Sequence, residues 1–285
     1  MRNILVRGTR AGFTAAVIAG AALCSAPAAL AKTATSSNWA GYAVHRPGVS
    51  FRQVSGTWTE PTTSCIPGQP SYSAMWVGIG GFKPTSDALE QIGSEVDCNP
   101  AGATASSAWY ELVPAPSKTI SLAVRPGDVM HATVTVVGQH VTLVLRNQTT
   151  HKSFRKSLYA PSVDVSSAEW IVEAPSECIS QSACQALPLA NFGSVAFDSA
   201  VATTAKGSAG PIISPKWSRT KIELTPGSPR FIVARQTSDT ASSATPSPLS
   251  GAGRDFDVTY SSVATPAAQF DSTRQSRLRA AYIEH

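Results

Sequence analysis

Hydrophobic and polar residues alternate along much of the chain with the two-residue period of β-strands. The clearest case is HATVTVVGQHVTLVLRN, residues 131–147, where two runs rich in β-branched residues flank Gly138 and Gln139. Two such runs around a short glycine-containing turn predict a β-hairpin. The turn sequences RPGD, residues 125–128, and TPGS, residues 225–228, each precede another strand-like run.

Strand candidates of this kind recur about every ten residues, with proline and glycine between them and without a sustained helical period. This spacing predicts an all-β domain, an antiparallel sandwich or barrel, over residues 32–263. Within it, the stretch rich in Ser, Thr, Ala, Pro and Gly at 237–253 predicts a long surface loop, and 256–263 a closing strand. Residues 264–285 predict a mobile basic C-terminal tail.

The first 31 residues have the pattern of a secretory signal peptide. A basic start, MRNILVRGTR, is followed by a short apolar run and by Ala29-Leu30-Ala31, which predicts cleavage after Ala31 and a secreted protein. The apolar run is too short to span a bilayer comfortably, so no membrane association is expected after cleavage.

Charge and cysteine content narrow the classes of function. Loss of three arginines with the signal peptide lowers the net charge from +5 to +2 (5 − 3 = 2), and the remaining basic residues are scattered, which argues against a nucleic-acid partner. Four cysteines remain, an even number that predicts two disulfides in an exported chain. Of the three possible pairings, the short loop between Cys178 and Cys184 favours Cys178–Cys184 with Cys65–Cys98. The sequence contains neither CxxC nor HExxH, so we expect no metal and no cofactor.

Several catalytic classes lack their sequence motif. There is no G-x-S-x-G for a serine nucleophile, and the closest approach to an aspartic peptidase turn, Asp198-Ser199-Ala200, lacks the glycine. The five histidines are dispersed. Carboxylate chemistry without histidine remains, and a strand at AEWIVE, residues 168–173, would place Glu169 and Glu173 on one face.

Seven motifs, taken together and in order, resemble successive blocks of the glutamic peptidase family, the eqolisins or G1 peptidases. The resemblance covers roughly residues 36 to 200 and implies two seven-stranded antiparallel sheets, with a groove for a protein or peptide substrate across the concave face. The motifs are SSNWAGY (36–42), SGTWTEP (55–61), MWVGIGG (75–81), LEQIG (89–93), AWYE (108–111), AEWIVE (168–173) and LANFGSVAF (189–197).

The resemblance also implies the site residues. Gln91 and Glu173 fall on the family's catalytic glutamine and glutamate, while Trp76, Trp109 and Glu111 fall on positions that line its active site and would contact substrate. A carboxylate can take a proton from water, and an amide can donate to an oxyanion without titrating in acid. We therefore expect a pepstatin-insensitive acid endopeptidase, monomeric as is usual for a secreted sandwich of this size.

The sequence departs from the family at two positions that carry aspartate in acid-adapted members. Gly80 and Ser107 stand there, and Glu95 or Asp97 could replace the aspartate that usually follows the glutamine. Without these two aspartates, fewer negative charges surround Glu173, so its pKa would be raised less than in those members. The two replacements also remove side chains whose neutrality in acid would matter for stability. We therefore expect a less extreme acid optimum than is usual for the family.

Other functions are compatible with the same residues. A secreted carbohydrate- or peptide-binding sandwich, including a catalytically inactive relative, would share the fold and the aromatic residues. A glycoside hydrolase could use Glu111 and Glu173 as its two carboxyl groups. For Glu169 we expect a solvated or hydrogen-bonded supporting role rather than catalysis. The spacing of the carboxyl groups and the position of Gln91 would separate these alternatives.

Overall fold

The computed structural model describes residues 32–180, 183–228 and 242–262. The predicted signal peptide, residues 1–31, and the predicted tail, residues 264–285, lie outside these ranges. So do the side chains of residues 177–185.

The described residues fold into eighteen strands and no helix, as the alternating pattern predicted. The predicted hairpin at 131–147 is confirmed, because its two runs form antiparallel β8 and β9. The strands are β1 (Lys32–Ser36), β2 (Trp39–His45), β3 (Phe51–Thr59), β4 (Ala74–Gly80), β5 (Leu89–Cys98), β6 (Thr104–Val113), β7 (Lys118–Ile120), β8 (Val129–Val137), β9 (His140–Asn147), β10 (Lys152–Tyr159), β11 (Ser167–Glu173), β12 (Ser176–Ser180), β13 (Ala183–Ala186), β14 (Ser194–Thr204), β15 (Ala209–Pro211), β16 (Ser218–Leu224), β17 (Ser242–Pro246) and β18 (Phe256–Ser262).

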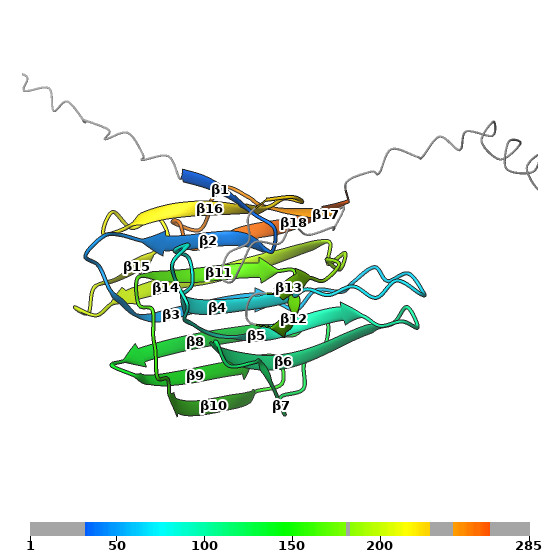
Figure 1. The fold of residues 1–285 in the computed structure, drawn as a ribbon, viewed down its shortest axis with the longest axis horizontal. Coiled ribbons are helices and arrows are strands. Elements are labelled where there is room, and N and C mark those ends of the chain that lie inside the picture. The colour runs from blue at the N-terminus through cyan, green and yellow to red at the C-terminus, as the bar shows by residue number, and fades with distance from the viewer. Residues whose placement is uncertain (1–31, 181–182, 229–241, 263–285) are drawn as a thin grey trace, which may run out of the picture. The chain divides into compact units, whose positions relative to one another are not determined.

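Sixteen of these strands form one hydrogen-bonded sheet in the order β10-β9-β8-β3-β14-β18-β17-β16-β2-β11-β4-β5-β6-β7, with β1 beside β16 and β15 beside β14. Neighbouring strands are antiparallel except β1 and β16. The sheet doubles back into two layers, so that β4 and β5 pack on β3, β8 and β9 (Figure 1). The all-β antiparallel class is therefore confirmed.

The implied pair of separate seven-stranded sheets is not what the strands form, because β17 pairs with both β16 and β18 and joins the layers. The seam to β16 is narrow, with Leu224 opposite Ala244. β17 also corrects the prediction of a loop throughout 237–253, since part of that stretch is a strand.

The main core lies between the two layers, where inward residues of facing strands interdigitate. Trp170 of β11 is fully buried there and donates its indole N–H to the Ser55 carbonyl at 2.8 Å. A Cβ at Gly56 would lie 2.7 Å from the Trp170 ring, so only glycine leaves room for this ring to pack so closely.

One predicted disulfide is confirmed, since Cys65 and Cys98 are joined with an S–S distance of 2.04 Å. The side chains of the second pair lie outside the described residues, although the backbone places Cys178 directly opposite Cys184 between β12 and β13. Across the described ranges, no helix is long and apolar enough to cross a membrane. In the same ranges no three His, Cys, Asp or Glu side chains gather in a way that could hold a metal ion.

Candidate functional site

A second, smaller hydrophobic cluster lies on the face of β2, β11, β4, β5 and β6 that is turned away from the main core. We call it the tryptophan face, after Trp39, Trp76 and Trp109. Because side chains alternate along a strand, this face also carries Gln91 and Glu173, whose registers place them beside these residues. The strand pairing thus collects all five predicted site residues, Glu111 included, on one surface.

Glu173 ends β11 and is half-buried, directly opposite Trp39 of β2 and Ala74 of β4. One carboxylate oxygen accepts a hydrogen bond from Trp76 Nε1 at 2.9 Å, and the other accepts one from Asn38 Nδ2 at 3.1 Å. Asn38 is itself oriented, because its side-chain oxygen accepts a hydrogen bond from the Ser36 hydroxyl at 2.9 Å. The carboxylate is therefore held by two neutral donors, one on the neighbouring strand β4 and one in the bend just before β2.

Gln91 lies on β5, with 4% of its surface exposed, opposite Glu111 on β6. Its Nε2 donates to Glu111 Oε2 at 2.7 Å, whereas its buried Oε1 has no hydrogen-bond partner in the described part of the chain. The bond to Glu111 occupies one of the two N–H groups of the amide. The second N–H group and Oε1 therefore remain available for a bound molecule.

The two tryptophans predicted to contact substrate differ in their surroundings. Trp76 is fully buried, packs edge-on against Trp39 with ring centroids 5.0 Å apart, and binds Glu173. Trp109 is 7% exposed, and its Nε1 has no hydrogen-bond partner among the described residues. Trp76 is thus placed to orient the carboxylate, and Trp109 offers an unused donor near Gln91, two residue pairs along β5 and β6 on the same face.

Glu169 does not have the solvated position that the sequence suggested. It is fully buried in the middle of the sheet, between Ala43 of β2 and Gly78 of β4, and neither carboxyl oxygen has a hydrogen-bond partner within the described ranges. Burial raises the pKa of Glu169 well above its usual range, and the nearby Asp164 and Glu90 carboxyls add to the effect. This group is therefore protonated and neutral in acid.

The structure supplies carboxylates near both positions where the family's aspartates are missing. Asp164 lies against Gly80, and its carboxylate accepts hydrogen bonds from the Ser86 hydroxyl at 2.6 Å and from the Gly81 N–H at 3.4 Å. Hydrogen bonds from Ser86, Ser166 and Gly81 outweigh the effect of burial and lower the pKa of Asp164. A carboxylate, that of Asp164, therefore lies beside position 80 even though the residue there is glycine.

The second position, Ser107 of β6, also has a carboxylate beside it, supplied by the neighbouring strand β5. Glu95 of β5 lies on the tryptophan face, across β4 from Glu173, and accepts a hydrogen bond from the Ser107 hydroxyl at 2.5 Å. Asp97, the other candidate replacement, lies at the end of β5 and accepts a hydrogen bond from the Ser73 N–H. Burial and Glu95 raise its pKa to about 7.

We expect Gly80→Ala to destabilise the protein more than Gly127→Ala. Both glycines have positive φ, 91° and 88°, so both substitutions impose a strain of roughly 1–2 kcal/mol. At Gly80 a Cβ would also lie 2.5 Å from the Asp164 carbonyl oxygen, whereas at Gly127 it would meet nothing within 4 Å. Urea unfolding of the two variants measures the difference, and equal losses would show that the Asp164 loop yields without cost.

Two residues of the site were not singled out from the sequence. Asn38 stands directly before Trp39 in the SSNWAGY motif, so its place in that motif was the available signal. Asp164 lies in a loop outside all seven motifs, and nothing in the local sequence points to its contact with Gly80.

Comparison with known proteins gives consistent matches. The model of a family described as the peptidase A4 family matches residues 37–244. Aspergillopepsin-2 of Aspergillus niger is 29% identical over 200 residues, which are 62% of this chain and 67% of that protein. The structure of scytalido-glutamic peptidase with a transition state analog inhibitor is 27% identical, with a TM-score of 0.60 over 79% of this chain and 98% of that one. SCP-B, an eqolisin solved with the tripeptide Ala-Ile-His, shares the fold at 24% identity and a TM-score of 0.56.

Proposed function

Because the chain belongs to the peptidase A4 family, the glutamic endopeptidases that its seven motifs resemble, we propose that it is a secreted enzyme that hydrolyses peptide bonds in acid with Gln91 and Glu173 as its catalytic pair. One observation supports this assignment most directly. Each of the two side chains is oriented by its own partners on one face, Glu173 by Trp76 and Asn38 and Gln91 by Glu111.

Glu173 acts in this proposal as the general base. Its carboxylate takes a proton from a water molecule as that water attacks the carbonyl carbon of the peptide bond. The same carboxyl group then gives the proton to the nitrogen of the leaving amine as the carbon–nitrogen bond breaks. Trp76 and Asn38 hold the carboxylate in place through both steps, because both donate to it and neither titrates in the acidic range.

Gln91 stabilises the negative oxygen of the tetrahedral intermediate. One amide N–H is fixed by Glu111, and the second is free to donate to the oxyanion. An amide keeps its donors at any pH in this range, and a carboxylate can still act as a base in acid where a histidine would already be protonated, so the pair suits acidic conditions. The unpartnered indole N–H of Trp109, on the same face, would donate to a carbonyl of the bound peptide. Glu111 would hold the Gln91 amide in place while it donates to the oxyanion.

The backbone argues against a glycoside hydrolase that pairs Glu111 with Glu173. These residues stand on β6 and β11, with β5 and β4 between them. Three strand spacings amount to about 14 Å between their backbones, one spacing more than separates Gln91 from Glu173. Two carboxyl groups that must lie about 5 to 9.5 Å apart for glycoside hydrolysis are therefore harder to bring together here than the Gln–Glu pair. Gln91, which a glycosidase does not require, lies between the two glutamates.

Hydrolysis of an unfolded protein by the mature chain, followed from pH 2 to pH 7 with pepstatin present, tests the proposal. We expect cleavage in acid that pepstatin does not inhibit, because the proposed pair contains no aspartic dyad. No cleavage at any pH would instead favour an inactive relative that binds peptides or glycans. Cleavage that pepstatin abolishes would contradict the Gln–Glu assignment.

A further inference from the structure

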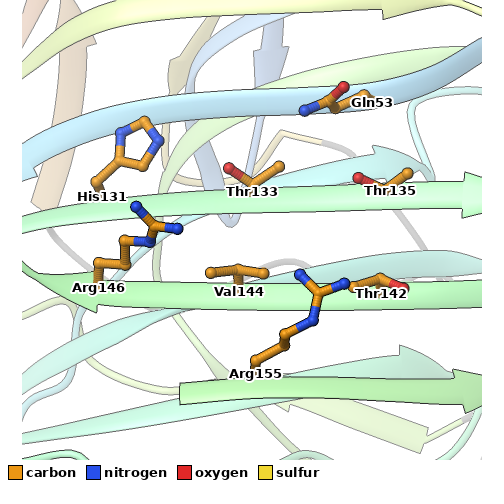
Figure 2. Close-up of a pocket in the computed structure, with 8 residues that line it drawn as sticks. All are labelled: Gln53, His131, Thr133, Thr135, Thr142, Val144, Arg146 and Arg155. Carbon is orange, nitrogen blue, oxygen red and sulfur yellow. The ribbon is translucent and has the colours of Figure 1, made fainter. Parts of the chain in front are cut away.

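The layer that does not carry the tryptophan face has a shallow polar hollow of about 340 Å³ on its outer surface, over β3, β8, β9 and β10 (Figure 2). Met130, Ala132 and Val134 of β8 point into the main core. The alternating residues His131, Thr133 and Thr135 therefore point outward and line the hollow.

Two arginines converge on this hollow without a carboxylate to neutralise them. Arg146 of β9 and Arg155 of β10 are exposed, and Figure 2 shows their guanidinium groups on either side of Val144. Because Arg155 pairs with Val144, the arginines are diagonal neighbours, whose Cα atoms lie about 7–8 Å apart. No acidic residue lines the hollow, and in the described part of the chain neither arginine forms a salt bridge.

The positive field at this surface extends to His131. Thr57 of β3 binds His131 Nδ1 at 2.9 Å and fixes the ring. Burial lowers the pKa of His131, and the charge of Arg146, directly opposite on β9, lowers it further. Like charges placed together on a sheet face are destabilising. A bound anion would remove that repulsion.

The remaining groups are those that recognise sugars. The hydroxyls of Thr133, Thr135 and Thr142 and the side-chain amide of Gln53 form the rest of the polar lining. Tyr159 extends the same face of β10 and is 62% exposed. It stands four residues beyond Arg155, about 13 Å along the strand, so a chain of several sugar units would reach from the arginines to the aromatic ring.

An acidic peptide fits this surface less well than an acidic glycan. The hollow lies on the face of the sheet, where the backbone N–H and C=O groups of β3, β8 and β9 are already paired with neighbouring strands. A peptide lying across this face could not pair with the strands beneath it and would leave its own backbone groups unmatched, because among the described strands of the hollow only β10 has an open edge. Sugar hydroxyls, in contrast, are matched by side-chain hydroxyls and amides.

We propose that this hollow binds an acidic polysaccharide, with a carboxylate or sulfate group held between Arg146 and Arg155 and a sugar ring packed on Tyr159. The site is separate from the tryptophan face, and the proposal does not depend on peptidase activity. Its role would be to hold the protein on an anionic glycan.

The test is affinity electrophoresis of the mature chain in gels that contain polygalacturonate, dextran sulfate, neutral dextran or poly-glutamate. We expect retardation by polygalacturonate or dextran sulfate, which distinguishes the carboxylate from the sulfate, and none by neutral dextran. The double variant R146Q/R155Q should bind the retarding glycan at least tenfold more weakly, and Tyr159→Ala should weaken binding severalfold.

The control is K118Q/K206Q, which removes two exposed positive charges on β7 and in the turn after β14 and should bind like the parent. Thermal unfolding of each variant shows whether it is folded. The proposal is overturned by the absence of retardation in both acidic glycans or by equal losses in the two double variants. Stronger retardation by poly-glutamate than by the glycans would also overturn it, because the hollow would then be a site for acidic peptides.

Discussion

Glu173→Gln is expected to lower kcat for peptide hydrolysis by about a thousandfold or more, with little change in KM. A general base typically contributes a factor of about 10² to 10⁴, and an amide cannot accept the proton of the attacking water. The loss should appear at every pH at which the parent is active, because it removes the base rather than shifting its pKa. Steady-state kinetics with a short peptide measure kcat and KM separately.

The matched control is Glu95→Gln, the same chemical change on the same face. Glu95 lies across β4 from Glu173 and accepts a hydrogen bond from Ser107, but the proposal gives it no proton to transfer. We expect a loss of less than about tenfold there, the size of an indirect effect through one hydrogen bond. Similar losses in both variants would point to a disturbed surface rather than to a base at Glu173.

The Glu173 variant should remain folded, because glutamine has nearly the same shape as glutamate. Its amide oxygen can accept from either Trp76 or Asn38, whereas its NH₂ group must then face the other donor. One hydrogen bond is thereby lost, which costs about 1 kcal/mol. A larger fall in unfolding free energy would mean that the kinetic loss includes misfolding.

Local sequence predicted the strands where one face of each is strictly apolar. β8 is the clearest example, because Met130, Ala132, Val134 and Val136 are buried and the residues between them face outward. β17 has no such pattern, since SSATP contains few apolar residues. It forms a strand because β18 lies along it and Leu224 of β16 pairs with Ala244. Such pairing is decided by tertiary structure and has no local signal.

The same distinction applies to the site. Gln91, Glu173, Trp76, Trp109 and Glu111 were predicted from motifs, and the strand register brings them to one face. Local sequence gives no sign of contacts such as that between Asn38 and Glu173, which are 135 residues apart. It also gives no sign that Glu169 would be buried without partners, because alternation fixes which side of a strand a residue faces and not what covers that side.

Stability is expected to fall steeply as the pH rises from about 4.5 to about 8. Burial raises the pKa of Glu60 to about 8 despite its hydrogen bond from Ser94, and burial together with Asp164 raises the pKa of Glu90 to about 8. The pKa values of Asp97 and Glu169 are raised in the same direction. The folded protein therefore holds protons on these carboxyls at a pH where the unfolded chain has released them.

The sign of the effect follows from this difference in bound protons. Below a pH of about 4.5 both states are protonated and burial of these groups carries no ionisation penalty. Above this pH the unfolded state is stabilised because its carboxyls ionise. The stability of the folded state therefore falls until the pH reaches the raised pKa of the buried carboxyls. His45 and His131 act in the opposite direction, because burial lowers their pKa values and favours folding above about pH 6.5.

Between pH 4.5 and 7.5 each carboxyl with a pKa of about 8 would cost about 4 kcal/mol, since one pH unit corresponds to about 1.4 kcal/mol. Glu60 and Glu90 together would then cost about 8 kcal/mol, which is comparable with the whole stability of a typical domain, about 5–15 kcal/mol. The protein should therefore be markedly less stable near neutral pH than in acid.

Glu60→Gln tests this account without removing the side chain. Glu60 is 1% exposed and accepts a hydrogen bond from the Ser94 hydroxyl, which in turn accepts one from Trp58 Nε1 at 2.9 Å. Glutamine can keep the bond to Ser94 but cannot ionise, so the variant should lose about 4 kcal/mol less than the parent between pH 4.5 and 7.5. Urea unfolding at the two pH values measures this difference, whatever the variant's stability at either pH alone. Glu223→Gln, which changes a partly exposed residue paired with Lys221, should leave the difference unaltered. A parent whose unfolding free energy is the same at both pH values would show that these carboxyls ionise in the folded protein without penalty.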